Sequence, residues 1–260
     1  MIFASLMKLK YRIVGEGRPV MIFHGLFGMS DNWQSFAKKL ADVGYQVVLG
    51  DLRNHGHSPH SEVHNYTAIA ADIAELISDL NLIHPDVIGH SMGGKSTLQL
   101  INDFPGLVRK AVVVDIAPYQ YPVHHREILD ALLSVDLEIV KRRGEAEKIL
   151  TDKIDDFGTR QFLLKNLYWE TPDQLAWRFN LKGLNRDIDE VGEPTWPSLQ
   201  NDTPVLFVRG EMSGYVEESR FNEILQWYPN AEFATIEGAG HWVHADKPDE
   251  LLHTIEDFLM

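Results

Sequence analysis

The chain has 260 residues and a formal net charge of −14 at pH 7, with 24 Lys and Arg against 38 Asp and Glu. A surface this acidic repels phosphate backbones and anionic lipids, so we expect neither nucleic acid nor a membrane surface as a partner. The chain has no Cys, which excludes disulfides, thiolate catalysis and Cys-ligated metal sites. Its length suits one large α/β domain or two small ones.

The N-terminal stretch MIFASLM is apolar but short, and no basic residues precede it, so it does not predict a secretion signal. One interpretation is that residues 1–6 extend a chain that starts naturally at Met7. No apolar run approaches the roughly 18 residues that a membrane-spanning helix needs. These features favour a cytoplasmic enzyme or binding protein whose partner is a small molecule.

Short apolar runs alternate with helical patterns along most of the chain. Residues 7–17 are expected to form an antiparallel edge strand. Buried strands are predicted at 19–25, 45–51, 86–90, 110–118 and 203–210, with 231–241 as a last strand and its following loop. Helices are predicted at 32–43, 66–80, 92–104 and from Pro248 onward, where Pro suits a first turn. This alternation indicates a doubly wound, mostly parallel α/β sheet.

Residues 119–200 interrupt this alternation, because they contain helical, charged stretches and no convincing buried strand. About eighty residues are far too many for a plain connection between two core strands. We interpret 119–200 as an inserted helical cap, and 1–118 with 201–260 as the core. Aromatic residues of the cap, such as Phe162 and Trp177, are candidates for the wall of an acyl pocket. Trp242, near the last helix, is a further candidate for the substrate pocket. The alternative is that they belong to the core of the cap.

Residues 89–93 read Gly-His-Ser-Met-Gly and match the pattern G-x-S-x-G between a predicted strand and a predicted helix. In such a sharp turn the flanking glycines avoid collisions, and Ser91 adopts a strained backbone conformation with its hydroxyl exposed. A third glycine, Gly94, lets the helix pack closely on the strand. The alternative is a loop serine that only caps a helix. The flanking strand and helix favour a nucleophile.

A nucleophilic serine needs a general base. His241 lies in a loop of small residues after the last predicted strand and before the last helix, from which it can reach Ser91. Because the chain has 12 histidines, any one of them could be a surface residue. The nearest alternative, His244, is expected where the loop already turns into a helix. We therefore predict that His241 is the base.

The oxyanion of a tetrahedral intermediate needs preorganised N–H donors. The amide of Met92 directly follows the nucleophile, and the amide of Leu26 lies in the glycine turn HGLFG after a strand. We predict that these two amides form the oxyanion hole. His55, His57 and His60 could suggest a metal site, but no carboxylate lies at ligand spacing, so we predict no metal.

These motifs together resemble the α/β-hydrolase superfamily, and more narrowly the ybfF-type bacterial esterases and their eukaryotic abhydrolase-domain relatives. The resemblance rests on HGLFG, DLRNHGHSPH, GHSMGGK, VVVDIAP and GAGHWVHADKP, in that order, and extends from Met7 onward, cap included. It implies an α/β-hydrolase fold and a Ser–His–Asp carboxylesterase or thioesterase without a cofactor. Small esters and acyl thioesters are the substrates that it implies.

The acid of the triad departs from the usual superfamily pattern. In most α/β-hydrolases it follows the strand after the cap, but here that position, aligned on Gly210, is Ser213. Glu211 is close, but it is expected to point away as it leaves the strand. Asp115 ends the strand that follows the elbow helix, one strand over, and a buried carboxylate there requires a partner. We predict Asp115 as the acid, with Glu211 as the alternative.

Two other functions remain open at this point. A triad-dependent lyase or carbon–carbon bond hydrolase has the same elbow and tends to place an arginine in the pocket, for which Arg53 and Arg178 are candidates. A non-catalytic binding protein on the same scaffold usually loses the serine or the histidine, and both are present. Dehalogenase chemistry is disfavoured because it would need Asp in place of Ser91.

Overall fold

The computed structural model describes residues 7–123 and 125–260. The interpretation of residues 1–6 as an extension concerns residues outside this description. Among the described residues, no helix is both long enough and apolar enough to cross a membrane.

The centre of the molecule is a seven-stranded sheet with the strand order β1-β3-β2-β4-β5-β8-β9. Its strands are β1 (Tyr11–Val14), β2 (Arg18–Phe23), β3 (Tyr45–Gly50), β4 (Asp86–His90), β5 (Ala111–Val114), β8 (Val205–Gly210) and β9 (Ala231–Ile236). Strand β1 pairs antiparallel with β3, and all other neighbours pair parallel. The mostly parallel sheet and its antiparallel N-terminal edge are therefore confirmed.

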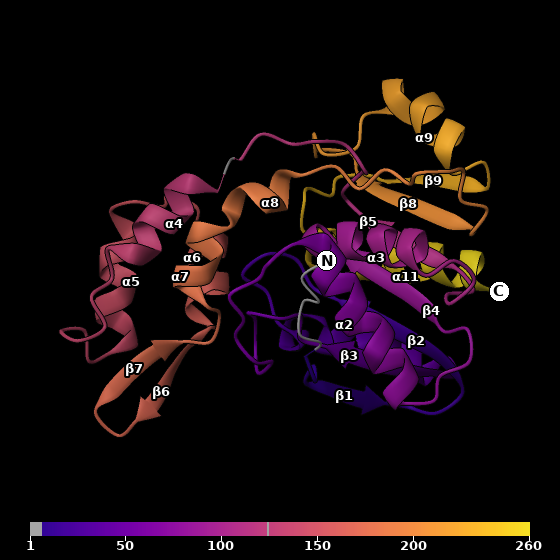
Figure 1. The fold of residues 1–260 in the computed structure, drawn as a ribbon. Helices are drawn as coiled ribbons and strands as arrows, with labels where there is room; N and C mark the ends of the chain where they lie inside the picture. The colour runs from indigo at the N-terminus through magenta and orange to yellow at the C-terminus, as the bar shows by residue number, and fades with distance from the viewer. Residues whose placement is uncertain (1–6, 124) are drawn as a thin grey trace.

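Helices cover both faces of this sheet (Figure 1). One face carries η1 (Ser30–Trp33), α1 (Gln34–Asp42), α10 (Val243–Asp246) and α11 (Pro248–Leu259). The other face carries α2 (Tyr66–Asp79), α3 (Met92–Asp103), and α9 (Phe221–Trp227), which follows η2 (Glu218–Arg220). Because successive strand residues point to opposite faces, Val20 and Ile22 pack in the first layer, and Met21 and Phe23 pack in the second.

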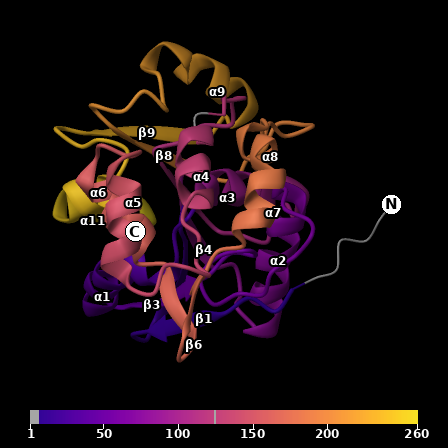
Figure 2. The same ribbon diagram turned by 90° about the vertical axis from the view of Figure 1, so that its left-hand side faces the viewer.

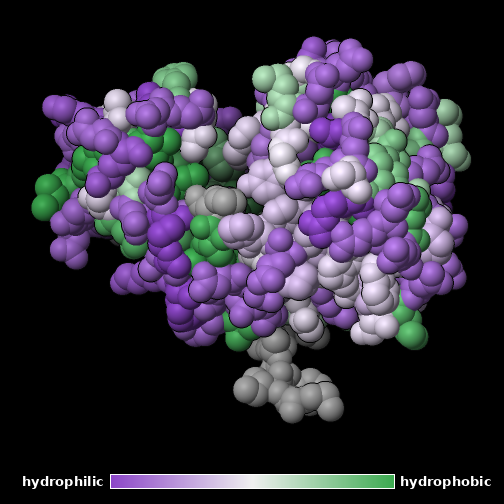
Figure 3. Space-filling model, turned by 90° about the horizontal axis from the view of Figure 1, so that it is seen from above, coloured by the Kyte–Doolittle hydropathy of each residue, from purple (hydrophilic) through white to green (hydrophobic). Residues whose placement is uncertain are grey.

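The chain between β5 and β8 forms a second lobe beside the sheet (Figures 1 and 2). Its elements are α4 (Arg126–Leu133), α5 (Arg143–Thr151), α6 (Phe157–Leu164), β6 (Leu167–Thr171), β7 (Gln174–Trp177), α7 (Leu181–Arg186) and α8 (Ile188–Gly192). Buried leucines fill the lobe, including Leu129, Leu150 and Leu163. Seen from above, a recess lies between the two lobes (Figure 3). We keep 119–200 as the predicted extent of the cap.

The cap is not entirely helical, because β6 and β7 form a two-stranded antiparallel hairpin that the sequence analysis did not anticipate. Most of β6 is exposed, so the hairpin lacks the run of buried apolar residues used to predict strands. The local signal for the hairpin was Pro172 and Asp173, which are typical turn residues, between stretches with aromatic residues, which favour strands.

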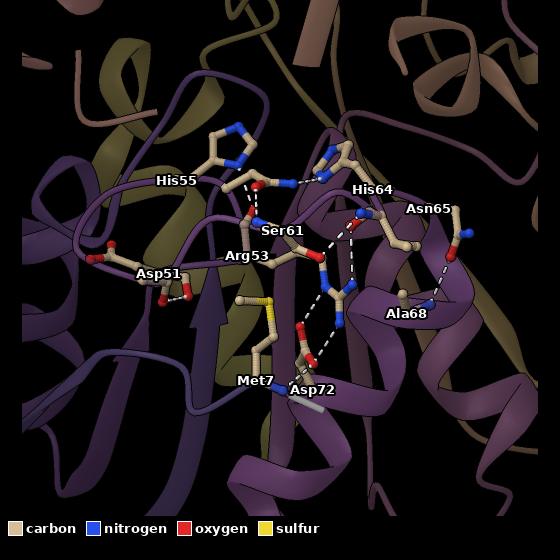
Figure 4. Close-up of polar contacts among 12 residues, drawn as sticks. Met7, Asp51, Arg53, His55, Ser61, His64, Asn65, Ala68 and Asp72 are labelled. Carbon is tan, nitrogen blue, oxygen red and sulfur yellow. Dashed lines mark hydrogen bonds and ion pairs between the residues drawn. The ribbon is translucent and has the colours of Figure 1, made fainter. Parts of the chain in front are cut away.

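A buried ion pair fixes the loop between β3 and α2 (Figure 4). The Arg53 guanidinium donates from Nε and Nη2 to the two carboxylate oxygens of Asp72, at 2.6 and 2.7 Å. Arg53 is 1% exposed and Asp72 is 0% exposed. Arg53 also donates to the carbonyl oxygen of Val63, and the Met7 amide donates to Asp72. The pair therefore ties the loop to α2 and to the start of the described chain.

Removing either member of this pair should destabilise the fold strongly, because the other charge would stay buried without a partner. We expect Arg53→Met to lower the free energy of unfolding by about 3–5 kcal/mol, measured by urea denaturation. The double variant Arg53→Met/Asp72→Leu serves as the control and should recover most of that loss. A single variant within about 1 kcal/mol of the parent protein would contradict this account of the pair.

Candidate active site

The candidate nucleophile, Ser91, lies in a strained turn between β4 and α3. Its φ of 52° and ψ of −119° are unfavourable for a residue with a side chain, as the sequence predicted. A Cβ atom on Gly89 would lie 2.1 Å from the carbonyl oxygen of Gly93. A Cβ atom on Gly93 would lie 2.5 Å from the carbonyl oxygen of Phe23. Both glycines are therefore required for the close approach that creates the turn.

The structure brings the predicted base and acid to this serine. His241 lies between β9 and α10, and its Nε2 atom is 3.1 Å from Oγ of Ser91. Its Nδ1 atom is 2.7 Å from Oδ2 of Asp115. The side chain of Asp115 is fully buried, whereas that of His241 is 23% exposed. The three side chains thus form a continuous chain of hydrogen bonds, with the solvent-accessible imidazole in the middle.

Asp115 follows β5 directly and has a positive φ of 52°. The Gly210 amide donates to its Oδ1 atom at 3.0 Å, and the Ser213 hydroxyl donates to its Oδ2 atom at 2.5 Å. Ser213, the residue that the sequence analysis aligned with the usual position of the acid, thus bonds to the predicted acid instead. The alternative acid, Glu211, instead accepts a hydrogen bond from the Gly238 amide at 2.9 Å.

His244, the alternative base, lies in α10 and is directed into the core. Its ring stacks on the Trp33 indole with a centroid distance of 4.1 Å and an interplanar angle of 17°. Burial lowers the pKa of His244 to about 3, so the ring stays neutral. His244 lines the groove beside Trp242 but not the cavity that contains Ser91. This position favours His241 over His244 as the base.

Sequence reasoning missed the position of His90, the residue before Ser91. Its Nε2–H group donates to the backbone carbonyl oxygen of His241 at 2.8 Å. Burial lowers the pKa of His90 well below its usual value, with the neighbouring His241 as the second cause. The neutral ring can therefore hold the loop of the base without adding a positive charge beside it. The motif contains His90, but no sequence pattern indicated its partner.

The predicted oxyanion loop lies directly beside Ser91. A Cβ atom on Gly25 would lie 3.1 Å from Cβ of Ser91, so only glycine allows this approach without displacement. Leu26 lines the same cavity as Ser91 and His241, and Met92 begins α3, where backbone N–H groups lack helical partners. The buried amide of Asn166, in the cap, donates to the carbonyl oxygen of Phe27 at 2.9 Å. The cap thus holds the oxyanion loop, which sequence reasoning did not foresee.

The cavity around Ser91 has a volume of about 220 Å³. Phe162 and Trp242 line it, and their ring centroids are 4.5 Å apart. Trp177, also a candidate for the pocket, does not line this cavity. The Trp177 ring stacks on the Phe179 ring within the core, with a centroid distance of 5.4 Å. This position favours the alternative that Trp177 belongs to the core and not to the pocket wall.

The two arginines considered for a substrate carboxylate lie elsewhere. Arg53 is committed to Asp72, and Arg178 lies over the Tyr168 ring and donates to His57 at 3.3 Å. Within 7–123 and 125–260, no arginine lines a cavity that contains Ser91. The structure therefore gives no support to Arg53 or Arg178 as pocket residues.

The histidines of the loop after β3 have separate partners. His55 Nδ1 bonds to the carbonyl oxygen of Arg53, and His60 Nε2 bonds to that of Arg178. No group of three or more residues suited to hold a metal ion occurs in the described part of the chain.

A family model described as alpha/beta hydrolase fold matches residues 18–142. Esterase YbfF of Escherichia coli is 36% identical over 246 residues, which cover 93% of this chain and 92% of that protein. The sn-1-specific diacylglycerol lipase ABHD11 of Mus musculus is 36% identical over 251 residues, covering 93% of this chain and 81% of that protein. A solved structure of a marine microorganism esterase is 37% identical with a TM-score of 0.94, covering 97% of this chain and 99% of that chain. The chain therefore belongs to the α/β-hydrolase superfamily, in the family of YbfF-type esterases and abhydrolase-domain proteins.

Proposed function

We propose that this protein is a serine hydrolase that cleaves small carboxylic esters or acyl thioesters through an acyl-enzyme on Ser91. The observation that carries the proposal is the chain of hydrogen bonds from Ser91 through His241 to Asp115, at 3.1 and 2.7 Å. This geometry suits proton transfer from a serine hydroxyl to an oriented imidazole. The names of the relatives, an esterase and a diacylglycerol lipase, support ester hydrolysis.

In the proposed mechanism, Oγ of Ser91 attacks the substrate carbonyl carbon while Nε2 of His241 accepts the hydroxyl proton. The negative charge that develops on the carbonyl oxygen is stabilised by the amides of Leu26 and Met92. The carboxylate of Asp115 stabilises the imidazolium of His241 and holds its orientation. No step requires a metal or a cofactor.

The tetrahedral intermediate then collapses, and the carbon–oxygen or carbon–sulfur bond to the leaving group breaks. His241 donates its proton to the departing alcohol or thiol. A water molecule, deprotonated by His241, attacks the acyl-enzyme and releases the carboxylic acid and free Ser91. Thioesters fit the same steps because only the leaving atom differs.

The other two functions are less well supported. A carbon–carbon hydrolase tends to place an arginine in the pocket, and neither candidate arginine lines the cavity at Ser91. A non-catalytic binding protein would not need the hydrogen bonds that join Ser91, His241 and Asp115. The cytoplasmic location expected from the sequence stays a prediction.

Ser91→Ala should abolish turnover because it removes the atom that forms the acyl-enzyme. With a p-nitrophenyl ester, we expect kcat to fall by roughly 10⁴-fold or more. A fluorophosphonate probe should label the parent protein but not the variant, as seen by intact-protein mass spectrometry. Full labelling of the alanine variant would rule out Ser91 as the nucleophile, and no labelling of the parent protein would revive the binding-protein alternative.

Asp115→Asn should preserve the fold, because Asn tolerates the positive φ at this position, but should remove the charge that stabilises the imidazolium. We expect kcat to fall by roughly 10³- to 10⁴-fold, with an unchanged melting temperature. Glu211→Gln is the matched control, since that carboxylate bonds to the Gly238 amide, and it should change kcat only slightly. The reverse order of effects would identify Glu211 as the acid.

A further inference from the structure

Ser91 lies between two cavities of very different size. The first, which we call the inner chamber, is lined by Ser91, Met92, Lys95, Ile116, Tyr121, Ile188 and Val191 among others and leaves about 20 Å³ free. The second, the outer chamber, is the cavity of about 220 Å³ that Leu26, Phe162 and Trp242 line. Phe162 and Trp242 also line a groove of about 540 Å³, so the outer chamber adjoins a larger space.

The position of the base determines which part of a substrate each chamber can hold. The leaving alcohol or thiol takes its proton from Nε2 of His241, so it must lie within hydrogen-bonding reach of that atom. His241 lines the outer chamber and is not among the described residues that line the inner chamber. The leaving group therefore belongs in the outer chamber. With the oxyanion directed at the amides, the acyl chain is left with the inner chamber.

The volume of the inner chamber limits the acyl chain. At about 20 Å³, the inner chamber has less than a tenth of the 220 Å³ of the outer chamber, so it suits a much shorter group. A longer chain would collide with the buried side chains of Ile116 and Ile188, which are 4% and 1% exposed.

The wall of the inner chamber at residues 191–193 is held in place by hydrogen bonds. The buried Lys95 ammonium donates to the carbonyl oxygens of Gly192 and Glu193, at 3.2 and 2.5 Å. The Tyr121 amide also donates to the carbonyl oxygen of Gly192, at 2.9 Å. The Lys95 ammonium lies 4.9 Å from the centroid of the Tyr121 ring. Because several bonds hold this wall, it cannot retreat from a longer acyl chain without losing them.

We propose that the inner chamber is the acyl site and restricts the enzyme to short acyl groups, acetyl or propionyl, attached to a bulky alcohol or thiol in the outer chamber and groove. This inference rests on the proposed ester or thioester hydrolysis. It assigns Phe162 and Trp242 to the leaving group, whereas the sequence analysis expected Phe162 at the acyl chain.

The first test varies one part of the substrate at a time. With 4-methylumbelliferyl acetate, butyrate and octanoate, kcat/KM should fall from acetate to octanoate, by about 10-fold or more for each methylene that the chamber cannot hold. With the acetate esters of methanol, benzyl alcohol and 2-(2-naphthyloxy)ethanol, kcat/KM should not fall as the alcohol grows. A parent protein that prefers octanoate, or that rejects bulky acetates, would overturn the proposal.

The second test compares the two chambers by substitution. Ile188→Ala enlarges the inner chamber and should raise the octanoate-to-acetate ratio of kcat/KM by about 10-fold or more. Val191→Ala enlarges the same chamber by less, and it replaces Ile188→Ala in this test if that variant does not fold. Phe162→Ala, in the outer chamber, is the matched control and should change the ranking of alcohols but not of acyl chains. A shift of acyl preference in Phe162→Ala alone would reverse the assignment of the chambers.

These outcomes are distinct from a failure of the proposed function. If the parent protein hydrolysed no ester or thioester of any length and took no fluorophosphonate label, the hydrolase proposal would fall and this inference with it. If it took the label and hydrolysed long acyl chains fastest, the hydrolase proposal would stand, and only the assignment of the inner chamber would be wrong.

Discussion

The position of Ser91 depends on how closely α3 packs against β4 and β2. The carbonyl oxygen of Gly93 lies where a Cβ atom of Gly89 would be, and Gly93 lies against the backbone of Phe23. This contact forces the chain to turn within one residue and leaves Ser91 with a positive φ of 52°. Such a conformation costs about 1–3 kcal/mol and persists only where the surrounding structure determines it. The same turn places Ser91 directly before the first N–H groups of α3, which the proposed mechanism uses for the oxyanion.

A second strained turn lies directly beside the first. His90 and Val114 are paired in the register of β4 and β5, so Ser91 and Asp115 leave the sheet side by side. Both residues have a φ of 52°, and both backbone amides remain bonded to the next strand, Ser91 to Val114 and Asp115 to Val208. This arrangement supports the proposal that the acid lies after β5 and not after β8, because the carboxylate needs to extend by only one strand spacing, about 4.8 Å.

Most of the fold could be predicted from the sequence because the sheet is buried on both faces. Runs such as 86–90 and 203–210 are continuous and apolar, and they coincide closely with β4 and β8. The β6–β7 hairpin could not be predicted in this way, since most of β6 is exposed and it therefore lacks a buried apolar run. At the site, chain order indicated Ser91 and His241 as candidates. The bonds of His90 to the base loop and of Asn166 to the oxyanion loop join residues that are 151 and 139 positions apart, and no local pattern encodes them.

The cap is bonded to the parts of the core that carry the proposed chemistry. Asn166 of the cap holds the oxyanion loop through the carbonyl oxygen of Phe27, and Lys95, one turn after Ser91, holds the returning chain at Gly192 and Glu193. Burial lowers the pKa of Lys95 to about 7, and its amine nitrogen remains bonded to these two carbonyl groups. The segment that limits the space beside Ser91 is thus bonded to the helix that positions Ser91. If the inner chamber is the acyl site, as we propose, a change in the cap that moved this segment would alter acyl selectivity while the bonds among Ser91, His241 and Asp115 stayed intact.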